Sequence, residues 1–207
     1  MTTKVTALAR LRIELNDTGS TKTWTDTYLN DLLDEAVDWY SLQFPLKMIA
    51  YKNVVANQRT FAVPTAMTDV DNIELPPGRR IPYDPSTPSG NPVNEPLQAQ
   101  TWKRYGSNIY IRNGATGDEI GTNYLQCEGH GTWDHLDPSE AWTGPDADVR
   151  LLILWCAWQA ATQADLNNAL QGRASVYGKA ALNFKAQLET EVASRRRKLT
   201  SRGGSTQ

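Results

Sequence analysis

The string Asp17-Thr18-Gly19-Ser20 contains residue types that could do acid–base chemistry. It matches the D-T-G-S motif of aspartic proteases, in which two such carboxylates share a proton. A catalytic carboxylate of that kind emerges from an apolar strand, whereas Glu14-Leu15-Asn16 precede this one at the end of a predicted helix. Asn, Asp, Gly and Ser are also typical of turns. We therefore interpret the string as a turn that terminates a helix.

A second group of residues has ligand types that suit zinc. Cys127, His130 and His135 are closely spaced, and Asp134 and Asp137 lie near them. Thiolate and imidazole groups are the usual ligands of a tetrahedral zinc site, but structural sites normally use two close pairs. We interpret this stretch as a strand that runs into a loop, and we predict neither a metal nor another cofactor.

Other catalytic signatures are missing from the sequence. The Gly-rich stretches Gly114-Ala115-Thr116-Gly117 and Gly129-His130-Gly131 lack the lysine of a phosphate-binding loop and do not open a predicted helix. Neither histidine is accompanied by a G-x-S-x-G nucleophile motif. The sequence therefore predicts a protein that is not an enzyme.

A cluster of four consecutive basic residues indicates a binding function. It consists of Arg195, Arg196, Arg197 and Lys198. The chain has 21 Lys and Arg and 23 Asp and Glu, for a net charge of −2. Residues 173–207 hold eight of the basic and two of the acidic residues, which is +6, so residues 1–172 carry −8. A basic arm on an acidic body typically contacts nucleic acid or an acidic protein surface.

Helical periodicity dominates both ends of the chain. Val5, Leu8, Leu11 and Leu15 form one stripe, and a second helix is expected to begin near Thr25 and to end at Pro45. A helix from about 147 to 170 is apolar almost all round at 151–158, which predicts a central position in a bundle. The last predicted helix follows Gly172 and runs into the basic cluster.

The middle of the chain has a strand-like period of two. Residues 51–55 and 59–63 suggest one hairpin, 102–105 and 109–112 suggest another, and 119–128 suggests a further strand. Ile73 and Leu75 suggest a short third strand. Residues 64–98 hold eight of the 11 prolines and otherwise predict an irregular proline-rich loop.

These patterns predict an α+β protein with a bundle of about four helices formed by both chain ends and an inserted small antiparallel β-domain. The expected helical bundle domain comprises residues 1–45 plus 146–199, the β-domain comprises 46–145, and 200–207 form a flexible tail. No apolar run reaches the ~20 residues of a membrane span, and no signal peptide is recognisable at the N-terminus, so we expect a reducing interior.

Several segments resemble head-to-tail connector proteins of long-tailed bacteriophages, also called adaptor or head-completion proteins. The likeness covers most of the chain in order, although its motifs are patterns of helix and turn. It is carried by residues 9–17, by the pattern from Trp24 to Tyr40, by Phe44-Pro45, by residues 73–79, by the hairpin at 105–112 and by the apolar helix at 151–158.

The resemblance implies a structural virion protein that forms a ring, commonly of 12 copies, beneath the portal at the neck between capsid and tail. Such a protein is assembled in the host cytoplasm, joins the portal to a further tail or neck protein, and lets double-stranded DNA pass without sequence-specific binding. The implied portal-binding arm is the last helix with Arg195, Arg196, Arg197 and Lys198. A ring needs two different contact faces on each subunit, and the candidate contact residues are Tyr177, Ala181, Phe184 and Trp102.

Two other functions fit parts of the sequence. The basic arm could serve a nucleic-acid-binding packaging component, which predicts salt-sensitive DNA binding that is lost on truncation after Ser194. Seven tryptophans, among them Trp102 and Trp133 in the predicted β-domain, could serve a carbohydrate-binding or hydrolytic domain of a tail tip.

Overall fold

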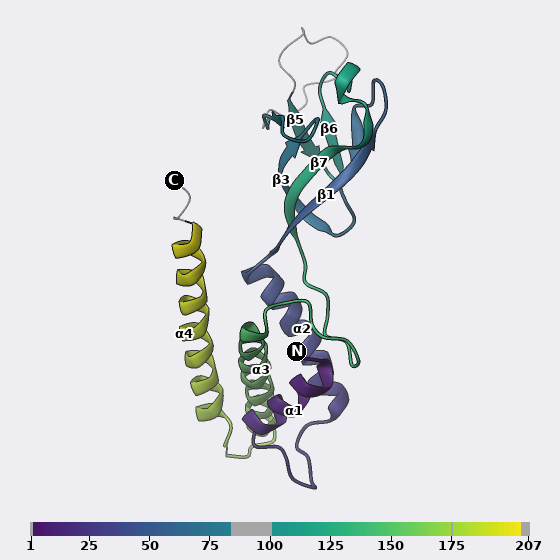
Figure 1. The fold of residues 1–207 in the computed structure, drawn as a ribbon. Coiled ribbons are helices and arrows are strands. Elements are labelled where there is room, and N and C mark those ends of the chain that lie inside the picture. Colours follow the sequence, from purple (N-terminus) through teal and green to yellow (C-terminus); the bar gives the residue numbers. More distant parts are fainter. Residues whose placement is uncertain (1, 84–100, 175, 204–207) are drawn as a thin grey trace. The chain divides into compact units, whose positions relative to one another are not determined.

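The computed structural model describes residues 2–83, 101–174 and 176–203. These residues form four α-helices and seven β-strands (Figure 1). The chain divides into a helical unit, Met1–Phe44 with Trp133–Gln207, and a β unit, Pro45–Thr132. The predicted α+β class is confirmed, because the helices come from both chain ends and antiparallel strands lie between them.

The helical unit consists of α1 (Lys4–Glu14), α2 (Asp26–Gln43), α3 (Val149–Leu170) and α4 (Gly178–Gly203). Thr25 caps α2 as its sequence predicts, and its side chain accepts a hydrogen bond from the backbone N–H of Tyr28 at 3.2 Å. Helix α4 includes residues 200–203, which we expected in the flexible tail. No Gly or Pro lies between Gly178 and Gly203, so nothing in this stretch interrupts the helix. Residues 204–207 lie outside the described part.

Helix α3 is the centre of the helical unit. All residues from Leu151 to Ala157 are buried, and α1, α2 and α4 each pack against this helix. A helix that is apolar on every side is shielded from water only when neighbouring elements enclose it.

The predicted stripe of α1 is wrong at Val5, which is exposed, whereas Leu11 is buried as expected.

The segment from Trp133 to Asp148 packs with the helices and not with the strands, although the sequence led us to expect residues up to 145 in the β-domain. Its apolar residues explain this difference. Leu136 and Trp142 are buried in the helical core, and the indole N–H of Trp133 donates a hydrogen bond to the carbonyl oxygen of Phe44 at 2.8 Å.

The β unit contains two antiparallel sheets. The first has the order β1-β7-β3-β4 and the second has the order β2-β6-β5. The strands are β1 (Leu46–Val54), β2 (Thr60–Ala62), β3 (Met67–Glu74), β4 (Arg80–Ile81), β5 (Trp102–Tyr105), β6 (Asn108–Ile111) and β7 (Gly121–Gly131). Their buried side chains, including Leu125, Ile109 and Trp102, form a separate core.

One predicted hairpin is confirmed and the other is wrong. Strands β5 and β6 pair across a turn at Gly106, whose φ is 57°. Strand β1 does not pair with β2, because β1 pairs with the distant β7 and β2 pairs with β6. A short apolar strand can pair with any complementary edge, so the nearest strand along the chain is not always its partner.

The predicted proline-rich loop at 64–98 is wrong for part of its length. Strands β3 and β4 occupy residues 67–74 and 80–81. The described prolines of this stretch flank these strands, where the missing N–H breaks no ladder hydrogen bond; they are Pro64, Pro76, Pro77 and Pro82. Residues 84–98 lie outside the described part.

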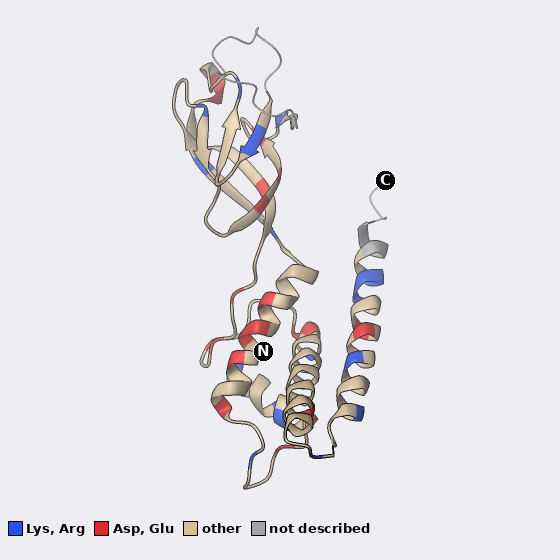
Figure 2. Ribbon diagram, turned by 180° about the vertical axis from the view of Figure 1, so that it is seen from behind, with Lys and Arg blue, Asp and Glu red and all other residues tan. Residues whose placement is uncertain are grey.

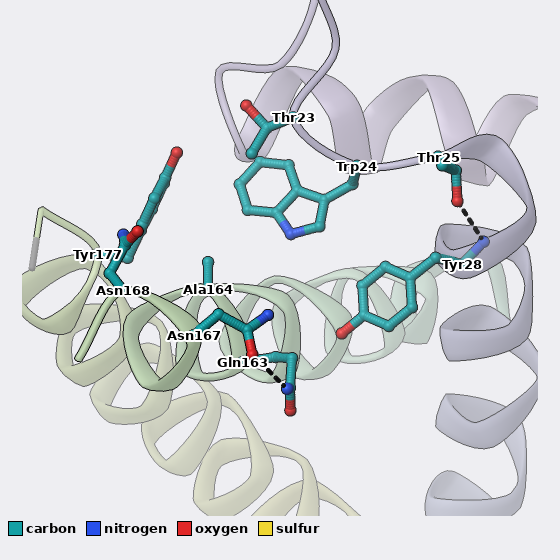
Figure 3. A pocket seen from close by; sticks show the side chains of 9 residues that line it. All are labelled: Thr23, Trp24, Thr25, Tyr28, Gln163, Ala164, Asn167, Asn168 and Tyr177. Atoms are coloured by element: carbon teal, nitrogen blue, oxygen red, sulfur yellow. Dashed lines mark hydrogen bonds between the residues drawn. The ribbon is translucent and has the colours of Figure 1, made fainter. Parts of the chain in front are cut away.

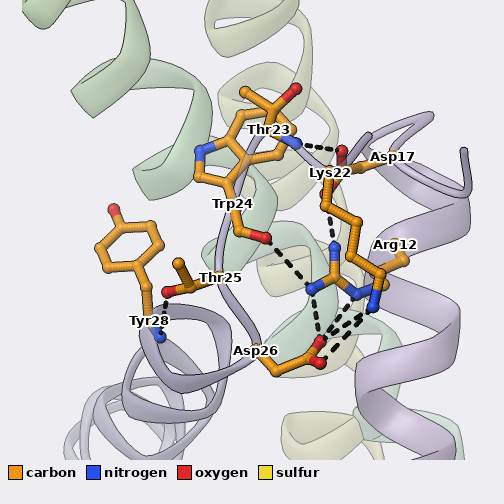
Figure 4. Close-up of polar contacts among 8 residues, drawn as sticks. All are labelled: Arg12, Asp17, Lys22, Thr23, Trp24, Thr25, Asp26 and Tyr28. Atoms are coloured by element: carbon orange, nitrogen blue, oxygen red, sulfur yellow. Dashed lines mark hydrogen bonds and ion pairs between the residues drawn. The ribbon is translucent and has the colours of Figure 1, made fainter. Parts of the chain in front are cut away.

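Polar contacts of Arg12 connect the end of α1 to the start of α2 (Figure 4). Its guanidinium forms ion pairs with Asp17, at 2.5 Å, and with Asp26, and it donates to the carbonyl oxygen of Trp24 at 3.2 Å. Asp17 also accepts the backbone N–H of Thr23 at 2.7 Å. The hydrogen bond from Arg12 lowers the pKa of Asp26. The D-T-G-S string is therefore a structural turn in which Asp17 is a buried partner of Arg12.

We expect Asp17→Asn to lower the free energy of unfolding of the helical unit by about 3 kcal/mol, because it leaves the buried Arg12 without one of its charged partners. Urea unfolding followed by the helical circular dichroism signal measures this effect. The matched control is Asp31→Asn on the exposed side of α2, with an expected change within about 0.5 kcal/mol. Equal unfolding curves for the two variants would contradict a structural role for Asp17.

Candidate partner-binding site at the end of helix α4

The packing of α4 decides which of its residues can reach a partner. Ala181, Phe184 and Leu188 are buried against the rest of the helical unit, and Val192 is half-buried. Spacings of three and four residues place these side chains on one face of the helix. The next residue on this face is Arg195, so the basic cluster begins on the buried side of α4.

Arg195 is bound inside the helical unit. Its guanidinium lies 2.9 Å from a carboxylate oxygen of Asp148, which is 4% exposed, and the hydroxyl of Tyr40 donates to the same oxygen at 2.5 Å. Burial, followed by the hydrogen bond to Asp148, raises the pKa of Tyr40 well above its usual range, so the phenol stays protonated. These three residues connect α4, α2 and the residue that precedes α3.

The other three residues of the cluster do not take part in this contact with Asp148. Arg196, Arg197 and Lys198 are exposed, and basic residues gather along the C-terminal part of α4 in Figure 2. Arg196 donates to the side-chain oxygen of Gln43 at 2.6 Å, and Arg197 donates to the carbonyl oxygen of Ala193 at 3.4 Å. The structure therefore divides the predicted arm into one structural arginine and three exposed basic residues.

The predicted contact residues between subunits are mostly internal. Ala181 and Phe184 belong to the helical core, and Trp102, 2% exposed, belongs to the core of the β unit. Tyr177 is half-buried, with its ring centroid 5.6 Å from that of Trp24 in an edge-on arrangement. The amphipathic pattern that marked Ala181 and Phe184 therefore describes burial within one chain, not a contact face.

The sequence reasoning missed an acidic face on α2. Asp31, Glu35 and Asp38 are exposed at spacings of four and three residues, so they lie on one side of the helix. Asp38 is 2.9 Å from a ring nitrogen of His135. The spacing of three and four residues between these acidic residues is visible in the sequence and could have identified this face.

The residues considered for metal binding are engaged in separate contacts. His130 pairs with Asp71 in the β unit at 2.8 Å, whereas His135 pairs with Asp38 in the helical unit. Cys127 is fully buried, and burial raises the pKa of its thiol to about 11. Within residues 2–83, 101–174 and 176–203, no three His, Cys, Asp or Glu residues gather as a metal site would need. No helix among them is long and apolar enough to span a membrane.

The two roles within the basic cluster predict different effects on stability. We expect Arg195→Met to lower the free energy of unfolding by roughly 2 kcal/mol, because the buried Asp148 loses its cation. Arg197→Met, with the same change of side chain at an exposed position, is expected to change it by no more than about 0.5 kcal/mol. Chemical denaturation measures both. If the two variants unfold alike, Arg195 does not hold α4 in place.

One protein-family model matches the chain. This model is described as SU10 adaptor protein and matches residues 2–206. No curated protein matches the chain. Because the match spans nearly the whole chain, the protein belongs to the SU10 adaptor protein family, a family of phage head–tail adaptors.

Proposed function

We propose that this phage structural adaptor is the connector that joins the portal to the tail as a ring of about 12 copies. The family match over residues 2–206 carries the proposal, since adaptors of phage virions contact other virion proteins. The resemblance to head-to-tail connectors supports the same position, beneath the portal at the neck of the virion. A further tail or neck protein binds the opposite side of the ring.

The portal-binding site consists of Arg196, Arg197 and Lys198. Three exposed cations near the C-terminal end of α4 concentrate positive charge there, which suits an acidic surface on the portal. Arg195 lies outside this site because its guanidinium is committed to Asp148. The role of Arg195 is to position the end of α4 from which the other three residues project.

The charge of the rest of the chain suits a DNA conduit. Residues 1–172 carry −8, and Asp31, Glu35 and Asp38 concentrate part of this charge on one exposed face of α2. Phosphates adhere to basic linings because contacts with Lys and Arg release counterions. An acidic face toward the channel lets double-stranded DNA pass without being retained.

Electron microscopy of the purified protein mixed with its portal tests the assembly. We expect a ring of the added protein at the narrow end of the portal. Portal particles that remain bare at saturating concentrations of the protein would refute the connector assignment. The same images give the number of subunits in the ring.

Charge reversal tests the proposed portal site. We expect the triple substitution R196E/R197E/K198E to weaken portal binding by roughly tenfold or more at low salt, since it replaces attraction by repulsion. The control R173E/K179E/K185E makes the same change of charge at exposed positions before and in the first half of α4, and is expected to alter affinity by less than about twofold. Surface plasmon resonance with immobilised portal measures both variants.

The same variants separate the connector from a packaging component that binds nucleic acid. A packaging component requires salt-sensitive DNA affinity that the R196E/R197E/K198E triple variant abolishes. A connector requires loss of portal binding with no measurable affinity for duplex DNA in either protein. Equal portal binding by the two triple variants would exclude the end of α4 as the portal site.

A further inference from the structure

The start of α4 lies against the second half of α3 and the start of α2. Tyr177, the residue before α4, lines a pocket of about 430 Å³ together with Trp24 and Asn168 (Figure 3). The ring centroids of Tyr177 and Trp24 are 5.6 Å apart. The start of α4 is therefore a second place of attachment, separate from the contact of Arg195 with Asp148.

Asp165 of α3 places its carboxylate against the first residue of α4. That residue is Gly178, and a Cβ atom added to it would lie 3.2 Å from each carboxylate oxygen of Asp165. A side chain would crowd the carboxylate at this distance, so the close approach favours glycine at the position. The backbone of α4 thus begins beside a negative charge that α3 supplies.

The charge of Asp165 complements the N-terminus of α4. This end of a helix carries a partial positive charge, which acidic residues of the first turn usually complement. Helix α4 has no acidic residue in its first turn, and Lys179 stands there instead. Within the described residues, the Oδ1 atom of Asp165 is buried and accepts no hydrogen bond. Because such an oxygen is costly to bury, the positive end of α4 is a favourable place for this carboxylate.

Two carboxylates from the two ends of α3 meet α4 in a single antiparallel register. Asp148, which precedes α3, and Asp165 are 17 residues apart, and their partners Arg195 and Gly178 are also 17 residues apart. At about 1.5 Å per residue, the two contacts are separated by roughly 25 Å along the helices. One contact alone lets a helix pivot, whereas two at this separation define both its position along α3 and its tilt.

The apolar contacts of α4 are less selective than these two. Ala181, Phe184 and Leu188 are buried against the helical unit, and the hydrophobic effect that favours their burial is non-directional. A buried charge, by contrast, is tolerated only where its partner stands. The apolar face therefore holds α4 on the helical unit, and the two carboxylates select its alignment.

We infer that Asp165 is a positioning residue for the portal site and acts with Asp148 to hold α4 in one register on α3. The exposed basic residues 196–198 follow Arg195 directly, so the register of α4 determines where their charges lie on the helical unit. The inference rests on the proposed function for the role of these three residues. The alignment of α4 is measured without the portal.

Hydrogen–deuterium exchange of the full chain tests the contact at the start of α4. We expect Asp165→Asn to speed amide exchange in residues 178–185 about threefold or more, because loss of the charge favours local opening of these turns. Residues 192–199 are expected to change by less than about twofold, since Arg195 still holds them. Asp165→Ala removes the side-chain contact as well as the charge and is expected to act in the same way.

The control for this experiment is Glu189→Gln, which removes an exposed carboxylate from the middle of α4. It is expected to leave exchange unchanged at both ends of the helix. If D165N and D165A both exchange like this control in residues 178–185, the inference is overturned.

Spin labels attached to A9C on α1 and A193C on α4 test the alignment itself. Both positions are exposed, and the two native cysteines are fully buried and stay unlabelled. We expect electron spin resonance to give one narrow distribution of label-to-label distances in the otherwise unaltered chain and a broadened one in D165N/R195M. An unchanged distribution in the double variant would overturn the attachment at two points.

Portal binding tests whether the alignment serves the site. We expect D165N/R195M to bind the portal about fivefold more weakly although residues 196–198 are intact, because a site on a mobile helix must be ordered on binding. The control Leu29→Ala lowers stability at a fully buried position of α2, distant in sequence from α4, and is expected to change portal affinity by less than about twofold.

Equal portal affinities of D165N/R195M and the unaltered protein would overturn the positioning role of Asp165. An equal loss in the Leu29→Ala control would overturn it as well, since reduced stability would then account for the effect. Failure of the unaltered protein to bind the portal would instead refute the proposed function. The exchange and distance measurements would still decide the alignment of α4.

Discussion

The helical unit depends on the enclosure of α3, a helix that is apolar on every side. The buried run from Leu151 to Ala157 has no face that tolerates water, so three other helices must surround it. Two of these come from the start of the chain and one from its end. The strands between them therefore form an insertion with its own core. The chain leaves the helical unit after Phe44 and returns to it at Trp133, and the indole N–H of Trp133 donates a hydrogen bond to the carbonyl oxygen of Phe44.

Polar contacts orient the helices around this apolar centre. Arg12 joins α1 to the start of α2, and Asp148 joins Tyr40 of α2 to Arg195 of α4. A buried carboxylate is costly unless it is paired and hydrogen-bonded, so Asp148 strongly favours the one packing of α4 that brings Arg195 to it. This fixes the direction in which the three exposed basic residues project, and it links the interior of the bundle to the candidate portal site.

Local patterns predicted the helices well and the sheet pairing poorly. Capping at Thr25 and the hairpin at 102–111 depend on residues close in sequence, and both are present. The pairing of β1 with β7 joins residues such as Ala50 and Cys127, which no local pattern relates. The resemblance to phage connectors rested on the order of helices and turns, and the family match over residues 2–206 agrees with it.

The sequence by itself determined the fold class, the apolar central helix, the acidic body and the basic end of the last helix, because periodicity and charge are properties of neighbouring residues. The tertiary structure alone decided that Arg195 is internal while Arg196 to Lys198 are exposed, and that Phe184 and Trp102 are core residues. It also brought Trp24, Asn168 and Tyr177 together in one pocket. The physical reason is that burial and partnership depend on which distant elements pack against a residue, and that packing is settled only when the whole core forms.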